Sequence, residues 1–505
     1  MASAKTACPD HAELFRSERY QEIFDRKKAY ENAHSPEEVE RVLEYTKSLE
    51  YQEKNFAREA AAINPLKSCQ PLGALYAGIG FADTLPYVHG SQGCASYFRS
   101  HFSRHFKEPF PAVSDSMTED AAVFGGHANM YQGLENAHKL YKPKMIALCT
   151  SCMAEVIGDD LSSFTKNAKD QGNIPADFPV ACAHTPSFVG SHITGYDAMM
   201  VSILETMGEK SDKTHDAINV ILGFDTYLGN FHEIRRIFGL FGVEVTILSD
   251  PTAMLDSPTD GEYQMYRGGT SLEELKDAPN AKGTIILQKY ALPKTAQLIK
   301  NKWEQEVKVV NPIGIAGTDE LIMAIAELTG KEVPDAITRE RGQLIDAIAD
   351  SYYWIYGKSF AINADPDQAY GITRFILELG GEPRHVLVTN AVKKWEKETQ
   401  ALLAEFPHGE GCQVYPKKDM WHMRSLLFTD PVDFIIGSSH AKYLWRDTRT
   451  PLIRFGFPLF DRHHLHRTST IGYQGGINLL TTIVNTILDE ADRASLDSPS
   501  FDLVR

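Results

Sequence analysis

Short apolar runs, many of them β-branched, alternate with helical stretches along most of this chain, and this alternation restricts its fold more than any other feature. Between residues 218 and 248, two such runs flank residues 230–242, whose apolar side chains recur at helical spacing up to the stop signal Gly242. Strand, helix and strand within about 30 residues make a βαβ unit, and residues 361–389 repeat it. The predicted strands are 145–148, 179–183, 218–222, 243–248, 284–287, 307–310, 386–389, 434–436 and 452–455. Repeated βαβ units predict parallel sheets with helices on both faces.

The length indicates how many such sheets to expect. A chain of 505 residues corresponds to about three domains of ~150 residues each. We expect an α/β fold of three Rossmann-like domains, with parallel β-sheets flanked by helices, plus a helical N-terminal arm. Ser35, followed by Pro36 and by Glu38, is a helix-start signal within the polar N-terminal segment. The expected divisions are the arm at 1–62, which wraps a partner subunit, and α/β domains at 63–212, 213–335 and 336–505, the last ending in a subunit-interface segment.

The composition argues against several classes of protein. The net charge of −16 disfavours nucleic-acid binding, which requires a basic face. The first ten residues lack the apolar core of a secretory signal, and no apolar run approaches the ~20 residues that cross a bilayer. Seven cysteines in a chain of this length do not indicate a disulfide framework. We therefore expect a cytoplasmic protein, without nucleic-acid or membrane partners, whose reduced thiols are free to bind metal.

Three cysteines lie in stretches punctuated by glycine, proline or polar turn residues: Cys69, Cys94 and Cys152. Ser187 occupies a fourth stretch of the same style. Soft thiolates held by turn backbone suit iron–sulfur clusters. Cys152 and Ser187 each follow a predicted strand, and ligands of such folds gather at the carboxyl ends of the strands. Three thiolates and a serine are too few for a cluster that requires four cysteines, so we predict that another chain supplies the rest at a subunit interface.

The other cysteines have different explanations. Cys149 and Cys152 form a C-x-x-C pair, which is typical of a redox dithiol or half of a zinc site, but the sequence contains no second such pair. Cys8, Cys182 and Cys412 fit the ordinary behaviour of cysteine as a small hydrophobic residue.

Two histidine motifs resemble metal sites. His101 and His105 are four residues apart, which is a zinc-binding spacing, but phenylalanines nearby in the sequence favour packing. The histidine-rich tract 461–467 also contains two arginines, which argue against a divalent cation. We predict a structural or interfacial role for that tract.

Phosphate-binding and acidic motifs give weaker signals. Residues 357–359 and 78–80 resemble fragments of nucleotide-binding loops but lack the required glycines. This disfavours a nucleotide-sugar or dehydrogenase-like enzyme and implies that a partner binds any ATP. Asp346 and Asp350 lie four apart on one helical face, so they form either a solvated acidic surface or half of a hard-cation site.

Long motifs around the cysteines resemble those of the nitrogenase family, in particular the β chains of its molybdenum–iron proteins. The matching stretches are 63–71, 89–94, 114–126, 152–160, 184–192, 456–458 and 460–467. The resemblance extends from about residue 10 to the final residues 502–505. It implies an α2β2 tetramer with three α/β domains in each chain.

The resemblance also implies a set of cluster ligands. By motif match, Cys69, Cys94 and Cys152 would be this chain's thiolate ligands of an [8Fe-7S] P-cluster shared with the α chain. Ser187 would be an additional oxygen ligand that binds on oxidation. Cys149 departs from the family pattern, and we assign it to packing.

Further positions match partner and cation sites of the family. Phe124 matches the docking residue for the ATP-hydrolysing iron protein. The carbonyl of Lys107 and the side chain of Glu108 match half of an inter-subunit site for Ca²⁺ or Fe²⁺, and Asp346 and Asp350 match the half from the other β chain. The family usually has arginine at position 107, but only the backbone is required there.

The resemblance implies the function of an electron relay. Electrons from the iron protein would pass through the P-cluster to the FeMo-cofactor held by the α chain, where dinitrogen is reduced to ammonia. The alternatives are a cofactor-assembly scaffold, a β chain of a vanadium or iron-only nitrogenase, and a subunit of a dark-operating tetrapyrrole reductase. The long N-terminal arm and Ser187 argue against the scaffold, and the arm also disfavours the vanadium and iron-only relatives.

Overall fold

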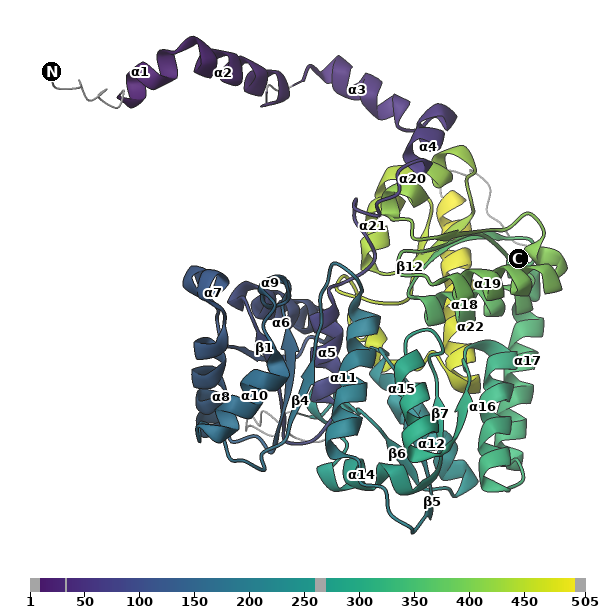
Figure 1. Ribbon diagram of the computed structural model, residues 1–505. Helices are drawn as coiled ribbons and strands as arrows, with labels where there is room; N and C mark the ends of the chain where they lie inside the picture. Colours follow the sequence, from purple (N-terminus) through teal and green to yellow (C-terminus); the bar gives the residue numbers. More distant parts are fainter. Residues whose placement is uncertain (1–9, 32–33, 259–268, 496–505) are drawn as a thin grey trace.

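The computed structural model describes residues 10–31, 34–258 and 269–495. Three parallel sheets, each covered by helices, lie in three lobes, and a helical arm extends away from them (Figure 1). None of the helices in the described part of the chain is long and apolar enough to span a membrane. The predicted α/β class is confirmed.

The first sheet has the order β2-β1-β3-β4, and every pairing in it is parallel. Its strands are β1 (Thr84–His89), β2 (Val113–Ser114), β3 (Met145–Thr150) and β4 (Val180–Ala183). Helices α5 (Gln70–Ile79), α6 (Gln92–Phe106) and α11 (His192–Met207) supply the apolar core on one face, and α8 (His127–Tyr141) and α10 (Leu161–Asp170) that on the other. Both faces of β1 and β3 are therefore buried, as expected for a parallel sheet.

The second and third sheets repeat this plan. The second has the order β6-β5-β7-β8 and the third β11-β10-β9-β12-β13. Their strands are β5 (His215–Ile221), β6 (Val245–Ile247), β7 (Ala281–Ile286), β8 (Glu306–Val309), β9 (Ser359–Asn363), β10 (Glu382–Val388), β11 (Gln413–Pro416), β12 (Phe434–Gly437) and β13 (Leu452–Arg454). Their helices include α12 (Leu228–Phe241), α16 (Gly314–Thr329), α17 (Asp335–Ile355), α18 (Pro366–Glu378), α19 (Lys393–Glu405) and α20 (Met420–Thr429). Each of the nine predicted strand segments overlaps an observed strand, and Gly242 ends α12 with a φ of 59°.

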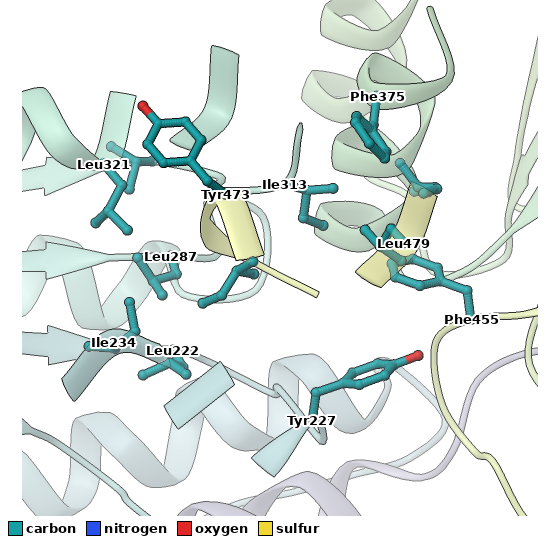
Figure 2. Close-up of a cluster of buried hydrophobic side chains, with 14 of the residues drawn as sticks. Leu222, Tyr227, Ile234, Leu287, Ile313, Leu321, Phe375, Phe455, Tyr473 and Leu479 are labelled. Carbon is teal, nitrogen blue, oxygen red and sulfur yellow. The ribbon is translucent and has the colours of Figure 1, made fainter. Parts of the chain in front are cut away.

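A shared core joins the second and third sheets. Side chains from both surround the long C-terminal helix α22 (Gly472–Ala494), which also packs on α16 and α17. Figure 2 shows Leu222 and Leu287, which directly follow β5 and β7, Phe455 directly after β13, and Tyr473 and Leu479 from α22 in one cluster. Full burial of each such side chain contributes about 1.5–3 kcal/mol. The helix thus ties two lobes together, and the exact domain boundaries stay a prediction.

The N-terminal arm consists of α1 (His11–Arg16), α2 (Glu18–Glu31), α3 (Pro36–Tyr45) and α4 (Leu49–Phe56). The Ser35 hydroxyl accepts a hydrogen bond from the Glu38 amide (3.2 Å), which confirms the predicted helix start. The arm contacts the body from the end of α3 onward. Asn55 Nδ2 on α4 donates to Ser425 Oγ (2.9 Å) on α20, and Thr46 Oγ1 at the end of α3 accepts from Arg424 Nη1 (3.1 Å). Helices α1 and α3 contain no buried residue, and Val42 on α3 is exposed.

Candidate functional site

Three cysteines lie at helix N-termini along one edge of the first sheet. Cys69 is the N-cap residue of α5, Cys94 lies in the first turn of α6, and Cys152 begins α9 (Cys152–Ile157). The loops that carry Cys94 and Cys152 follow the carboxyl ends of the neighbouring strands β1 and β3. Each helix N-terminus presents unpaired N–H groups and partial positive charge to this edge, which favours an anionic ligand set.

The three thiols share one region. Burial, followed by the charges of Cys69 and Cys152, raises the pKa of Cys94 above its ordinary value. Such coupling requires the sulfurs to lie near one another. Cys69 is exposed and the other two are partly exposed. Within the described ranges, no group of three or more His, Cys, Asp or Glu side chains is arranged to hold a metal ion by itself. The three cysteines supply soft donors of the kind that iron binds, and the site is open to solvent at Cys69.

Cys149 differs from these three in its environment. It lies within β3, where its side chain belongs to the apolar core beneath α5 and α11. Burial raises its pKa to about 12, so it remains a neutral thiol. Cys412 is likewise buried and packs beside Leu402 and Leu403, as predicted. Cys182 is partly buried in β4 and contacts Thr165 Oγ1 (3.4 Å), whereas Cys8 lies outside the described residues.

Ser187 lies in the loop after β4, and this loop is tied to the start of α5. Gln70, next to Cys69, donates from Nε2 to the carbonyl of Pro186 (2.6 Å). A Cβ at Gly190 would come within 2.6 Å of the Gln70 side chain, so the loop approaches α5 closely. The partly exposed Ser187 hydroxyl is thus carried on a loop fixed beside Cys69.

A buried histidine joins the loops around the cysteines, and the sequence analysis did not identify it. His89 Nδ1 hydrogen-bonds Asp115, and its Nε2 lies 2.9 Å from Asp159 Oδ2. Burial by itself lowers the pKa of His89, but hydrogen bonds to the two carboxylates outweigh burial and the pKa is raised. The available signal was the position of all three residues within the long motifs 89–94, 114–126 and 152–160.

An apolar patch lies next to this edge of the sheet. Phe124, at the end of α7 (Glu119–Phe124), is 80% exposed, and Val123 is 76% exposed. Val156 on α9 is 75% exposed. Helices α7 and α9 pack together through a small core that includes Ala121 and Ala154. Clusters of large exposed apolar side chains are typical of protein-interaction surfaces. The docking role of Phe124 stays a prediction, and we call Val123, Phe124 and Val156 the docking patch.

The predicted cation ligands lie on separate elements of this chain. Lys107 is the C-cap of α6, and its Nζ donates to the carbonyl of Phe460 (3.0 Å). Glu108 lies 3.7 Å from Arg467 Nη2. Asp346 and Asp350 are exposed on α17. The structure does not bring the two pairs together, so an inter-subunit cation site stays a prediction.

The remaining histidine motifs are part of the packing. His101 and His105 contact the ring of Phe457 at centroid distances of 5.2 and 5.1 Å, which confirms the packing prediction. Burial lowers the pKa of His101 to about 4 and that of His105 to about 3. In the tract 461–467, Asp461 pairs with Arg454 (3.1 Å), which is a structural contact.

Comparisons with known proteins identify close relatives. The sequence matches the family described as "Nitrogenase component 1 type Oxidoreductase" over residues 69–488, and a domain of unknown function over residues 1–55. The nitrogenase molybdenum–iron protein beta chain of Nostoc sp. is 58% identical over 503 residues, covering 98% of each chain. That of Azotobacter vinelandii is 50% identical over 493 residues, covering 95% of this chain and 94% of its own. A chain of the solved structure "Nitrogenase Cp1 at pH 6.5" is 41% identical, with a TM-score of 0.85 over 89% of this chain and 98% of that chain.

Proposed function

Because this chain belongs to the nitrogenase component 1 type oxidoreductases, among their molybdenum–iron protein beta chains, we propose that it holds half of an [8Fe-7S] P-cluster. Cys69, Cys94 and Cys152 would be its thiolate ligands, and the α chain would supply the others. The P-cluster, when bound, stores and passes on electrons. The chain is a subunit of the nitrogenase complex, and the assembly-scaffold, vanadium and iron-only alternatives are less well supported.

One observation carries this proposal: three solvent-accessible thiols lie at three helix N-termini, and two of them, Cys69 and Cys152, lie near enough to Cys94 to raise its pKa. Thiolates so close together repel one another unless a cation lies between them. The positive charge of iron removes that repulsion and lowers the pKa of each coordinated thiol. The open side of the site is where a second chain would complete it, which agrees with the α partner that the beta-chain family implies.

Ser187 would contribute an oxygen ligand from its loop beside Cys69. A hydroxyl that loses its proton on binding iron is a harder ligand than a thiolate and favours the more oxidised metal. Since ligation requires deprotonation, oxidation at this site would release a proton. The hydrogen bond from Gln70 Nε2 to the carbonyl of Pro186 (2.6 Å) holds this loop beside Cys69, which supports the proposed role.

The docking patch would receive the iron protein, which hydrolyses ATP and delivers electrons. Cys152 and Val156 lie on the same helix, α9, four residues and therefore about 6 Å apart along its axis. A partner seated on the patch would thus be only one helical turn from a cluster ligand. Electrons would pass onward to the FeMo-cofactor in the α chain, where dinitrogen is reduced.

The assembly would be an α2β2 tetramer. The exposed helices α1 to α3 would lie along the α chain, and the carbonyl of Lys107 with Glu108 would share Ca²⁺ or Fe²⁺ with Asp346 and Asp350 of the second β copy. Carboxylate and carbonyl oxygens suit such hard cations. All six cysteines in the described ranges are free thiols, which supports a reducing, cytoplasmic location.

The test compares two cysteine variants of the co-purified tetramer. We expect Cys94→Ala to lose iron, the electron paramagnetic resonance signal of the oxidised cluster, and dinitrogen reduction. Cys182→Ala, which removes a partly buried thiol on β4 that is not among the proposed ligands, should retain all three properties. Full iron content and activity in Cys94→Ala would contradict the proposal.

A further inference from the structure

His89 is a buried ionisable residue that neither the proposed cluster nor the docking patch uses. It ends β1, its side chain has no exposed area, and it lies between the carboxylates of Asp115 and Asp159. Buried charges are stable only while each hydrogen-bond partner stays in place. This Asp–His–Asp centre therefore fixes the relative positions of the segments that carry its members.

The segments on either side of helix α7 contact this centre or Gly90, the residue that follows His89. Before the helix, the Met117 amide donates to the carbonyl of Gly90 (2.9 Å). After it, the Gly126 amide donates to Asp159 Oδ2 (3.1 Å). A Cβ at Gly126 would lie 2.7 Å from His89 Cε1 and 2.6 Å from Asp159 Oδ2. Because no space separates these groups, a shift of α7 must move the centre.

The same centre holds the loops that present Cys94 and Cys152. The His89 carbonyl accepts from the amide of Ser151, the residue before Cys152 (2.9 Å). Gly90 begins the turn that leads to Cys94, and its amide donates to Asp115 Oδ1 (2.9 Å). Asp115 is the carboxylate that pairs with His89 Nδ1. Gly90 has a φ of 148°, and a Cβ there would lie 1.9 Å from Ser151 Oγ. The two loops are therefore packed directly on one another.

We propose that His89 is a positioning residue that couples docking of the iron protein at α7 to the geometry of the Cys94 and Cys152 loops. This inference rests on the proposed function, since it takes the docking patch and the cysteine ligands as given. Displacement of α7 passes through Gly126 and Asp159 to His89, and from there to both loops. Close-packed interiors transmit such shifts between discrete arrangements because they cannot deform continuously.

Hydrogen–deuterium exchange on the intact tetramer, with and without iron protein held by a non-hydrolysable nucleotide, tests this coupling. In the parent, docking should slow exchange at residues 119–126 and also at residues 90–94, behind the docking surface. In His89→Gln and Asp159→Asn, protection at 119–126 should persist. The docking-dependent protection at 90–94 should fall at least about fivefold, the lower end of usual coupling factors.

The matched control is Asp367→Asn. Asp367 is an equally buried carboxylate that accepts backbone hydrogen bonds from Tyr290 (3.1 Å) and Ala291 (3.0 Å), between the second and third sheets. Asp367→Asn should leave the docking-dependent protection at residues 119–126 and at residues 90–94 intact. If His89 has only a structural role, its loss changes the exchange rate at residues 90–94 equally with and without the iron protein. The ratio of the rates with and without the iron protein therefore reports the coupling.

The outcomes separate this inference from the proposed function. Unchanged docking-dependent protection at residues 90–94 in His89→Gln and Asp159→Asn overturns the coupling. A parent without protection at 119–126 overturns the docking proposal instead, and a parent without the oxidised-cluster resonance overturns the cluster proposal. If both variants fail to assemble, Gly126→Ala is the deciding variant, because it displaces the same contact and leaves His89, Asp115 and Asp159 in place. Retained docking-dependent protection at residues 90–94 in Gly126→Ala refutes the coupling.

Discussion

Two helices meet at glycines directly behind the proposed cluster site, and Gly73→Ala tests whether this contact positions the ligands. A Cβ at Gly73 on α5 would lie 1.7 Å from the carbonyl oxygen of His192 on α11, and a Cβ at Gly195 would lie 1.9 Å from that of Gln70. Real Cβ atoms essentially never approach closer than 3.0 Å. The alanine must therefore separate the two backbones by about 1.3 Å, since close-packed interiors leave no slack, and Cys69 would move with α5.

We expect Gly73→Ala to destabilise the first lobe by about 3 kcal/mol, at the upper end of overpacking effects, because the obstacle is backbone that cannot rotate away. For a domain of about 150 residues, this lowers the midpoint of thermal unfolding by about 6–12 °C. The measurement is a thermal melt of the purified tetramer together with its iron content. Iron content should fall because the displaced Cys69 no longer meets the other two thiols.

Gly239→Ala on α12 is the matched control. Apart from the neighbouring residues and backbone of α12 itself, no atom lies within 4 Å of a Cβ at that position. The substitution should therefore be neutral or slightly stabilising through reduced freedom of the unfolded chain. A Gly73→Ala tetramer with full iron and a midpoint within about 2 °C of the parent, less than 1 kcal/mol, would refute the reasoning.

Three other variants probe docking, pH dependence and assembly. Phe124→Ala should weaken iron-protein binding at least about 30-fold, which is the loss expected at a docking hot spot. The control is Leu140→Ala, at an exposed position on α8, which should leave binding unchanged. Equal affinities of the two variants, measured by titration, would contradict the docking role of Phe124. Burial raises the pKa of Asp225 to about 6, so its folded form holds a proton that the unfolded form releases, and stability is lost as pH rises from about 4 to about 6. Asp225→Asn should reduce the fall in melting temperature between about pH 4 and about pH 6. An unchanged dependence of melting temperature on pH would contradict the proposed role of Asp225. The double variant Asp346→Ala and Asp350→Ala should separate the tetramer into αβ halves, which size-exclusion chromatography would detect. A chelator should have the same effect on the parent protein. An intact tetramer in both experiments would contradict the proposed cation site.

Local pattern was sufficient for most elements and for the candidate ligands. One example is the helix that ends at Gly242, together with the strands on either side of it. These elements were predictable because the spacing of apolar residues and the glycine that ends the helix involve residues only a few positions apart. Strand β1 was missed because Pro86 interrupts its apolar run and His89 ends it with a polar residue. The cysteines were recognisable from their turn neighbours and from the family motifs around them.

The sequence by itself thus determined which segments become strands and helices, and which thiols are presented by turns, since both follow from neighbouring residues. Only the tertiary structure decided that Asp115 and Asp159, which are 26 and 70 residues from His89, meet on its two ring nitrogens. The same holds for the contact of Gly73 with the backbone of α11. Such contacts depend on the path of the chain through the first lobe, and residues far apart in sequence carry no local pattern that reports it.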